Sequence, residues 1–285
     1  MSTTKIISLI DGSIYSKSVC EYTAWAAGKL DSSVELMHVL GRREASASGD
    51  LSGAIALGAR TALLDKLADL DAERGKLLQE KGRAIIEDAR KILTDAGIAK
   101  VEARMWTGDL VELLTGREAN ANLVVVGKRG EAADFASLHL GSNLERIVRA
   151  SHKPVLVASR AYKPINKVLI AWDSASSSEK AVDYVARSPL LAECQVHLVF
   201  VGQETAEIKA GLAKASSTLA AAGHEATKTV LPGQAEKVLG EFVASENFEM
   251  VVMGAYGHSR IRSLIIGSTT TAMIRTCKVP VLLIR

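Results

Sequence analysis

The stretch that decides the fold is MVVMGAYGHSRIRSLIIGSTTT, residues 250–271. Its first four residues are apolar and are typical of the end of a buried strand. Gly254 and Gly257 follow, and glycine lets a chain turn sharply and lets another group approach the backbone closely. After nine intervening residues, Gly267 opens a Ser-Thr-Thr run that leads into a predicted helix at 272–275. The stretch therefore predicts a strand, a glycine-rich loop and a helix.

The same stretch carries the features of an anion site. Free backbone N–H groups, the positive end of a helix dipole and hydroxyl groups together hold phosphates. Ser268 and Thr269 supply hydroxyls, and His258 and Arg260 lie between the two glycine groups. An ordinary strand–loop–helix turn with a Ser/Thr cap explains these residues equally well, because glycine-rich turns recur in parallel α/β folds.

Repetition of this arrangement along the chain favours a ligand site. Four strands predicted at 5–10, 34–40, 101–106 and 123–126 lead to Gly127 and Gly130, then Gly141-Ser142-Asn143, a helix at 144–150 and a strand at 154–158. The second half repeats this order with strands at 167–172, 195–201, 224–230, 250–253 and 280–284. The linker at 159–164 ends in a proline, so we expect domains at 1–160 and 164–285.

Only the first half contains an insertion, at about 41–80. Residues 41–58 are rich in Gly, Ser and Ala and predict a loop, and residues 61–96 predict a long helix. We expect Gly75 and Gly82 to kink or divide that helix, its leucines to pack in the core, and its charged residues to form a solvated face.

Strands that alternate with helices, without tight hairpin turns, predict an α/β fold with a parallel sheet and helices on both faces. We therefore expect two tandem doubly wound domains. Ligands of such sheets bind at the carboxyl ends of the strands. Asp173, Gly233 and Gly254 all follow predicted strand ends, so they are expected to converge on one crevice.

Composition excludes several classes of protein. The 285 residues are 48% hydrophobic and 24% charged, which is typical of a globular protein with substantial cores. A net charge of +3, with 4% aromatic residues and no basic block, argues against nucleic-acid binding. Cys20, Cys194 and Cys277 are far apart and are expected to be free thiols. Without a signal peptide or a membrane-length apolar run, we expect a cytoplasmic location.

Taken together, the motifs resemble the universal stress protein family. Nucleotide-binding members of that family carry G-x-x-G, nine residues and then G-[ST], which Gly254 to Gly257 and Gly267-Ser268 match. Asp11 and Asp173 match the family's first-strand Asp, and the runs that begin at Pro154 and Pro280 match its last strand. The resemblance covers both halves and implies a tandem protein with a Rossmann-like domain, containing a five-stranded parallel sheet, in each half. It also implies that the last strands of the halves pair, as in an internal pseudo-dimer; whether two chains then form a homodimer is open.

ATP, with Mg²⁺ held through its phosphates, is the ligand that the resemblance implies. It assigns Asp173 to the adenine or ribose end, Val201 to the base, Gly233 and Gly254 to close backbone approach, and Gly257, Gly267, Ser268 and Thr269 to the phosphates. Ala171 and Met253, at strand ends, complete this set, and His258 and Arg260 are added from their charge and position. The corresponding residues of the first half are Asp11, Val39, Gly108, Gly127, Gly130, Gly141, Ser142 and Asn143.

The first half departs from the family pattern. Ten residues, not nine, separate Gly130 from Gly141, and they include Glu131 and Asp134, which repel phosphate. Asn143 replaces the hydroxyl residue Thr269. We therefore expect one competent nucleotide site, in the second half, and an altered site in the first half.

Several residues have plain structural explanations. His38 and His197 lie in apolar runs and are expected to be satisfied strand residues, since no second metal ligand has suitable spacing. Trp172 is expected to pack between elements. The sequence contains no P-loop, kinase motif set or H-E-x-x-H motif, and no catalytic base can be named. A regulatory nucleotide-binding protein of the stress response is the first hypothesis, a scaffold with unidentified protein partners is the second, and a slow ATPase is the third.

Overall fold

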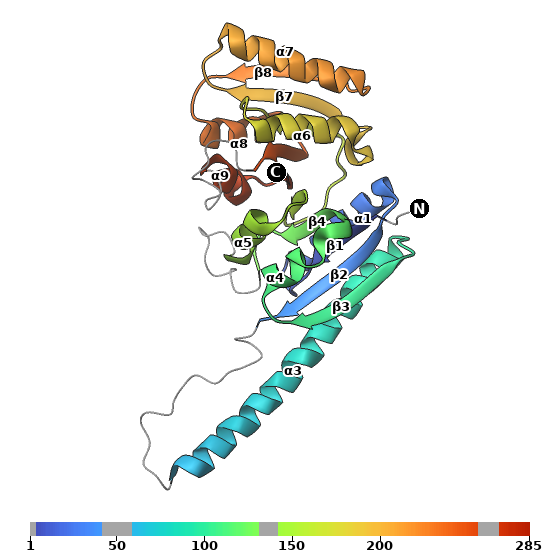
Figure 1. Cartoon of the computed structure of the whole chain (residues 1–285), viewed down its shortest axis with the longest axis vertical. Coiled ribbons are helices and arrows are strands. Elements are labelled where there is room, and N and C mark those ends of the chain that lie inside the picture. Colours follow the sequence, from blue (N-terminus) through green and yellow to red (C-terminus); the bar gives the residue numbers. More distant parts are fainter. Residues whose placement is uncertain (1–3, 42–58, 131–141, 256–267) are drawn as a thin grey trace.

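The computed structural model describes residues 4–41, 59–130, 142–255 and 268–285 (Figure 1). Its strands in the first half are β1 (Lys5–Leu9), β2 (Ser33–Leu40), β3 (Val101–Thr107), β4 (Ala121–Gly127) and β5 (Val155–Ala158). Those in the second half are β6 (Lys167–Ala171), β7 (Gln195–Val201), β8 (Thr227–Leu231), β9 (Met250–Gly254) and β10 (Val281–Ile284). The predicted strands are therefore confirmed, with small shifts at their ends.

Helices connect the strands in both halves. The first half contains α1 (Ser16–Leu30), α3 (Ala59–Asp95), α4 (Leu110–Thr115), the 3₁₀ turn η1 (Glu118–Asn120) and α5 (Ser142–Ala150). The second half contains α6 (Ser176–Arg187), the 3₁₀ turn η3 (Pro189–Leu191), α7 (Ala206–Ala221), α8 (Ala235–Ser245) and α9 (Ser268–Thr276). Between β3 and β4 the chain forms two short segments, because α4 ends at Thr115 and η1 follows.

All ten strands form one sheet in the order β3-β2-β1-β4-β5-β10-β9-β6-β7-β8. Within each half the strands are parallel, as expected for an α/β fold. β5 and β10 pair antiparallel, with Leu156 opposite Leu282. The last strands therefore join the two halves into a continuous sheet, as the resemblance implied.

Two apolar layers cover the two faces of this sheet. Neighbouring residues such as Ile6 and Ile7 point to opposite faces and are both fully buried. One layer contains residues of α1, α3, α6 and α7, and the other contains residues of α4, α5, α8 and α9. Because both faces are covered, the strands read as continuous apolar runs instead of alternating patterns.

Two cations cross the junction between the halves. Lys128, just after β4, donates from Nζ to the backbone oxygen of Cys277 at 2.7 Å. Arg285, at the end of the second half, donates from its guanidinium to the backbone oxygens of Arg149 and Ser151, at 2.8 and 3.1 Å. Both cations therefore satisfy carbonyls at the C-terminal ends of helices, where positive charge is favourable.

The long helix α3 corrects two predictions. It runs without a break from Ala59 to Asp95, so neither Gly75 nor Gly82 divides it. Gly82 instead allows close packing, because a Cβ there would lie 2.6 Å from the sulfur of Met105 and 3.1 Å from the ring of His38. The leucine stripe of Leu63, Leu67 and Leu70 was expected in the core, but Leu63 and Leu70 are 39% and 60% exposed.

This stripe is exposed because only the C-terminal part of α3 packs against the body of the molecule, meaning the sheet and the helices that cover it. The helix residues in the core lie near its C-terminal end: Ile86, Ala89 and Leu93 are buried, and Ile85 and Ile92 pack against them. The first half of the helix projects away from the sheet (Figure 1). Most of the charged side chains described in this projecting part are exposed, as predicted, and Asp71 is partly exposed; an ion pair joins Arg90 and Glu87 farther along. The predicted loop at 41–58 lies outside the described residues, apart from Gly41.

Trp172 packs between elements, as predicted, and is only 3% exposed. Its indole N–H donates to Glu179 at 2.8 Å, and its ring meets Phe200 edge-on with 6.0 Å between centroids. Helix α7 passes so close that a Cβ on Gly211 would lie 2.4 Å from the indole ring. Gly211 therefore sets the distance between α7 and the end of β6.

This contact predicts opposite effects for two glycine substitutions. Gly211→Ala should lower the free energy of unfolding by about 1–3 kcal/mol, because the rigid indole cannot move aside. Gly28→Ala is the matched control: Gly28 also lies in a helix, but a Cβ there would meet nothing within 4 Å. That control should raise the free energy of unfolding by up to about 1 kcal/mol. Urea titration measures both values, and equal effects would contradict the proposed contact.

The Lys128 bridge predicts a dependence of stability on pH. Burial lowers the pKa of Lys128 from 10.5 to about 8, with a smaller contribution from Arg129 in the same direction. Between these values the unfolded chain binds more protons at this group than the folded chain, so raising the pH stabilises the fold. From about pH 8 to about pH 10, wild type should therefore gain stability relative to Lys128→Met. A difference between the two proteins that does not change with pH in urea titrations would contradict this assignment.

Candidate functional site

The carboxyl ends of four adjacent parallel strands carry the predicted residues of the second half. Ala171 ends β6 and pairs with Met253 on β9, while Val201 ends β7 and pairs with Leu231 on β8. Gly233 follows β8, and Gly254 is the last residue of β9. The fold therefore brings five residues that are far apart in sequence to one edge of the sheet: Ala171, Val201, Gly233, Met253 and Gly254.

Asp173 shapes the turn between β6 and α6. Its carboxylate accepts a hydrogen bond from the backbone N–H of Ala175 at 3.0 Å, and its own N–H donates to the hydroxyl of Ser178 at 3.3 Å. Between them, Ser174 has a φ of 63°, in the left-handed region. The side chain of Asp173 is exposed, so its carboxylate can meet a ligand beside the strand ends.

Steric constraints require glycine at two turns near Asp173, at Gly254 and at Gly233. A Cβ on Gly254 would lie 2.5 Å from the hydroxyl oxygen of Ser177 and 2.7 Å from its backbone carbon. Gly233 has a φ of 119°, which residues with a Cβ rarely adopt, and a Cβ there would lie 2.8 Å from Val238. The missing Cβ atoms therefore let Ser177 and Val238 pack against the two turns, and the backbone is exposed at Gly233 and partly exposed at Gly254.

Helix α9 begins at the end of the predicted phosphate loop. Ser268 is its first residue and is exposed, Thr269 is partly exposed, and Thr270 is 4% exposed. Two hydroxyls and the free N–H groups of the first turn are thus available to an anion. The predictions for Gly257, His258, Arg260 and Gly267 lie outside the described residues.

In the first half, the Asp11 turn meets the glycine loop directly. The carboxylate of Asp11 accepts from the N–H of Ser13 at 3.0 Å, and the hydroxyl of Ser13 donates to the backbone oxygen of Arg129 at 3.4 Å. A Cβ on Gly130 would lie 3.0 Å from the Asp11 carboxylate. The turn and the loop therefore leave little space between them.

The remaining predicted residues of the first half occupy equivalent places. Val39 lies near the end of β2, Gly108 follows β3 with a φ of 150°, and Gly127 ends β4. Ser142 and Asn143 begin α5, and Asn143 is exposed. The prediction for Gly141 lies outside the described residues.

Sequence reasoning missed the residues that pack behind the glycine turns. Ser177 lies against Gly254 in the second half, whereas Tyr15 occupies the matching place against Gly127, with 2.9 Å between its Cβ and a Cβ built on the glycine. Tyr15 is 7% exposed and Ser177 is 4% exposed. The serine-rich run after Asp173, residues 174–178, was the signal that could have identified Ser177.

The two strand histidines are satisfied, as predicted. His38 is 7% exposed, and its Nδ1 lies 2.9 Å from the backbone oxygen of Ile10. His197 meets the hydroxyl of Thr229 at 2.7 Å and packs edge-on against Phe242 and Phe248. Burial lowers the pKa of His197, which favours a neutral ring.

The thiols are free, and the described side chains form no cluster suited to a metal. Cys20, Cys194 and Cys277 carry no disulfide. Burial raises the pKa of Cys20 to about 12 and that of Cys194 to about 11, so both are poor nucleophiles at neutral pH. Within the described ranges, no group of three His, Cys, Asp or Glu residues could hold a metal ion.

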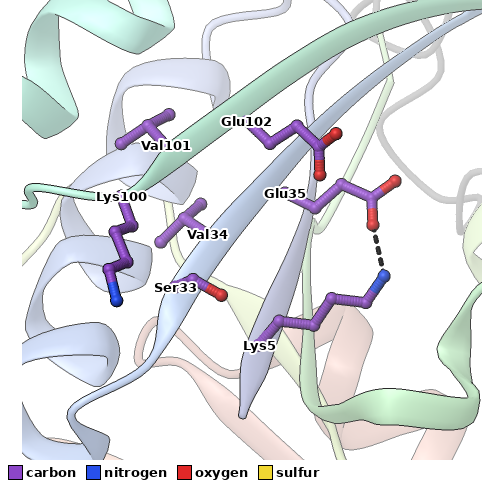
Figure 2. Close-up of a pocket in the computed structure, with 7 residues that line it drawn as sticks. All are labelled: Lys5, Ser33, Val34, Glu35, Lys100, Val101 and Glu102. Atoms are coloured by element: carbon purple, nitrogen blue, oxygen red, sulfur yellow. Dashed lines mark hydrogen bonds and ion pairs between the residues drawn. The ribbon is translucent and has the colours of Figure 1, made fainter. Parts of the chain in front are cut away.

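A hollow of about 280 Å³ lies at the amino ends of β1, β2 and β3 (Figure 2). Glu35, which is 2% exposed, lies beside it, with Lys5 at 2.5 Å and Arg117 at 3.2 Å. Two cations thus neutralise this buried carboxylate. The hollow is at the other end of the first-half strands from Asp11 and Gly127, so it is separate from the predicted site.

Comparison with known proteins identifies the family. The universal stress protein family matches this chain twice, over residues 3–159 and 164–285. A curated relative, universal stress protein Slr1230 of Synechocystis sp., is 37% identical over 284 residues, or 98% of this chain and 99% of the relative.

Solved structures agree on the fold. A crystal structure of a universal stress protein from Archaeoglobus fulgidus is 21% identical, covers 100% of this chain and 99% of its own, and superposes with a TM-score of 0.75. A Pseudomonas aeruginosa structure is 16% identical, covers 99% of this chain and 93% of its own, and has a TM-score of 0.64. Among the described helices, none is both long enough and apolar enough to cross a membrane. From these matches and the repeated order of its strands, we conclude that the chain belongs to the universal stress protein family and contains two copies of the family's domain.

Proposed function

We propose that this protein is a regulatory protein of the stress response that binds ATP with Mg²⁺, and that the nucleotide binds mainly in the second half. The observation that carries the proposal is the shared edge of β6, β7, β8 and β9, where the Asp173 turn, Gly233 and Gly254 lie together. Ligands of parallel α/β sheets bind at this edge.

Each part of the nucleotide has residues of suitable chemistry. The exposed Asp173 carboxylate suits the N–H or O–H groups of adenine or ribose, and Val201 offers an apolar surface to the base. The backbone is exposed at Gly233 and partly exposed at Gly254, so the nucleotide can approach it there. Ser268 and Thr269, at the start of α9, suit the phosphates, and in our proposal Gly257, His258, Arg260 and Gly267 complete this part.

The contrast between the halves supports a single competent site. In the first half, a Cβ built on Gly130 would lie 3.0 Å from the Asp11 carboxylate, and the hydroxyl of Ser13 donates to the backbone oxygen of Arg129. The bulky Tyr15 stands where the second half has Ser177. Together with the acidic Glu131 and Asp134, these residues make the first half a poorer phosphate site.

Two other functions stay as alternatives. A scaffold that binds protein partners without a nucleotide would use the same fold. A slow ATPase would need a positioned catalytic base in addition to the nucleotide site. Regulation through nucleotide occupancy needs no catalytic base, because a ligand that binds only the folded protein shifts the stability and the conformations of that protein.

Titration of Mg-ATP into protein stripped of bound nucleotide tests the proposal directly. We expect saturable binding with one equivalent per chain, measured by isothermal titration calorimetry. Binding of two equivalent nucleotides would contradict the assignment to the second half. No binding by folded protein that carried no nucleotide when purified would favour the scaffold.

Matched glycine substitutions locate the phosphates. Gly257→Val should abolish Mg-ATP binding, because its side chain would occupy the space of a phosphate. Gly130→Val makes the corresponding change in the first half and should leave the affinity and the stoichiometry unchanged. Circular dichroism checks that both variants fold. Unchanged affinity in Gly257→Val would show that the loop is a structural turn.

A second pair of substitutions tests the adenine or ribose end. Asp173→Asn keeps an oxygen that can accept from the N–H of Ala175, but it removes the negative charge. We expect about 5- to 30-fold weaker ATP binding, the effect of losing a charge-assisted hydrogen bond. Asp11→Asn is the control in the first half and should not change the affinity. Equal effects of the two variants would contradict the assignment.

A further inference from the structure

The projecting half of α3 carries an apolar seam that the fold leaves uncovered. Leu63, Leu70 and Leu77 follow one another at intervals of seven residues and are 39%, 60% and 59% exposed. Leu67 lies between the first two and is partly exposed. Ala84 continues the spacing and is also exposed, whereas Ile86, Ala89 and Leu93 meet the core on another side of the helix. The seam is therefore not an extension of the core face.

Such spacing is the pattern of a coiled coil. Leucines every seven residues, with a further apolar residue three or four positions away, form a stripe that packs against a second helix. Packing of an amphipathic face supplies most of the stability of helices in proteins, so a partner for this stripe would stabilise the projecting part. We propose that this seam binds the same seam of a second copy of the chain, in an antiparallel two-helix coiled coil.

Charge complementarity identifies one register of the pair. When Leu67 packs against Leu70 of the second copy, Lys66 comes beside Glu73 of that copy, at the edge of the seam. The two-fold symmetry produces each of these contacts twice. The stem of Arg74 then packs beside Leu63 of the other helix while its charged end stays in water. Both symmetry-related Lys66–Glu73 pairs of this register are attractive.

The other arrangements bring like charges together. A shift by one heptad would place Leu67 against Leu77. It would bring Lys66 beside Glu80 twice, but it would also bring Glu73 against Glu73 and Asp71 against Asp71, which offsets the gain. A parallel pair would place Arg74 against Arg74 inside the seam. Like-charge pairs at these positions are unfavourable. Charge thus favours the antiparallel pair in the first register.

The length of the projecting helix fits this register. The two-fold axis of the proposed pair passes between Ala68 and Asp69. Ala59, the first residue of α3, therefore lies opposite Leu78 of the second copy. Gly82, where packing against the body begins, lies just beyond. At about 1.5 Å per residue, the overlap is roughly 30 Å long, and the two bodies lie at opposite ends of it. A parallel pair would instead bring both bodies to the same end.

Sedimentation velocity over a concentration series tests the proposal with the full chain. Wild type should form a dimer as the concentration rises. Leu70→Glu should weaken that dimer by at least about 100-fold, because two charges would enter the seam. Ala72→Glu adds the same charge on the opposite, exposed side of the helix and should leave the dimer unchanged. Leu70 is exposed within one chain, so Leu70→Glu should keep the fold, which circular dichroism checks.

A charge exchange tests the register. Lys66→Glu should weaken the dimer about 3- to 10-fold through two new Glu–Glu contacts. The double variant Lys66→Glu/Glu73→Lys restores the complementary pairs and should restore the dimer. A wild type that stays monomeric at every concentration, or a dimer that Leu70→Glu does not weaken, would overturn the proposed seam. A double variant no stronger than Lys66→Glu would overturn the antiparallel register. The proposal is independent of nucleotide binding.

Discussion

Backbone pairing between β5 and β10 holds the molecule together as one sheet. Each half alone would expose its last strand as an edge with unpaired N–H and C=O groups, which is a hazard for aggregation. Here each edge strand satisfies the other. Lys128 and Arg285 add bonds to helix carbonyls across the same junction. The two cores therefore lie against one continuous sheet, and neither half needs a second chain to cover its last strand.

The antiparallel sense of that junction also decides where sites can lie. Strands within each half are parallel, so all carboxyl ends of one half share an edge. Because β5 and β10 run in opposite directions, the carboxyl edge of the first half and that of the second face opposite ways. Two nucleotide-binding edges in one chain would thus be separate sites. Lys128 follows β4 and donates from Nζ to the backbone oxygen of Cys277, just after α9. This hydrogen bond links the glycine turn of the first half to the second half.

Duplication of a fold does not require duplication of its chemistry. Both halves place an Asp after the first strand and a glycine after the fourth. The packing behind these residues differs, with Tyr15 in one half and Ser177 in the other. Such exchanges leave the backbone path unchanged, since a buried position tolerates different side chains when the neighbours fill the volume. A half that keeps its fold is therefore free to lose or alter its ligand.

The sequence by itself determined the strands, the repeat, the parallel α/β class and the family, because these depend on local periodicity and on motifs such as Gly254 to Ser268. It also identified His38 and Trp172 as packing residues. Only the tertiary structure decided the packing of α3 and of the glycine turns. Periodicity shows that Leu63, Leu67 and Leu70 share one face of a helix, but it cannot show whether another element covers that face. Likewise, the contact of Gly211 with Trp172, and of Gly130 with Asp11, joins residues distant in sequence, so each exists only once the sheet has formed.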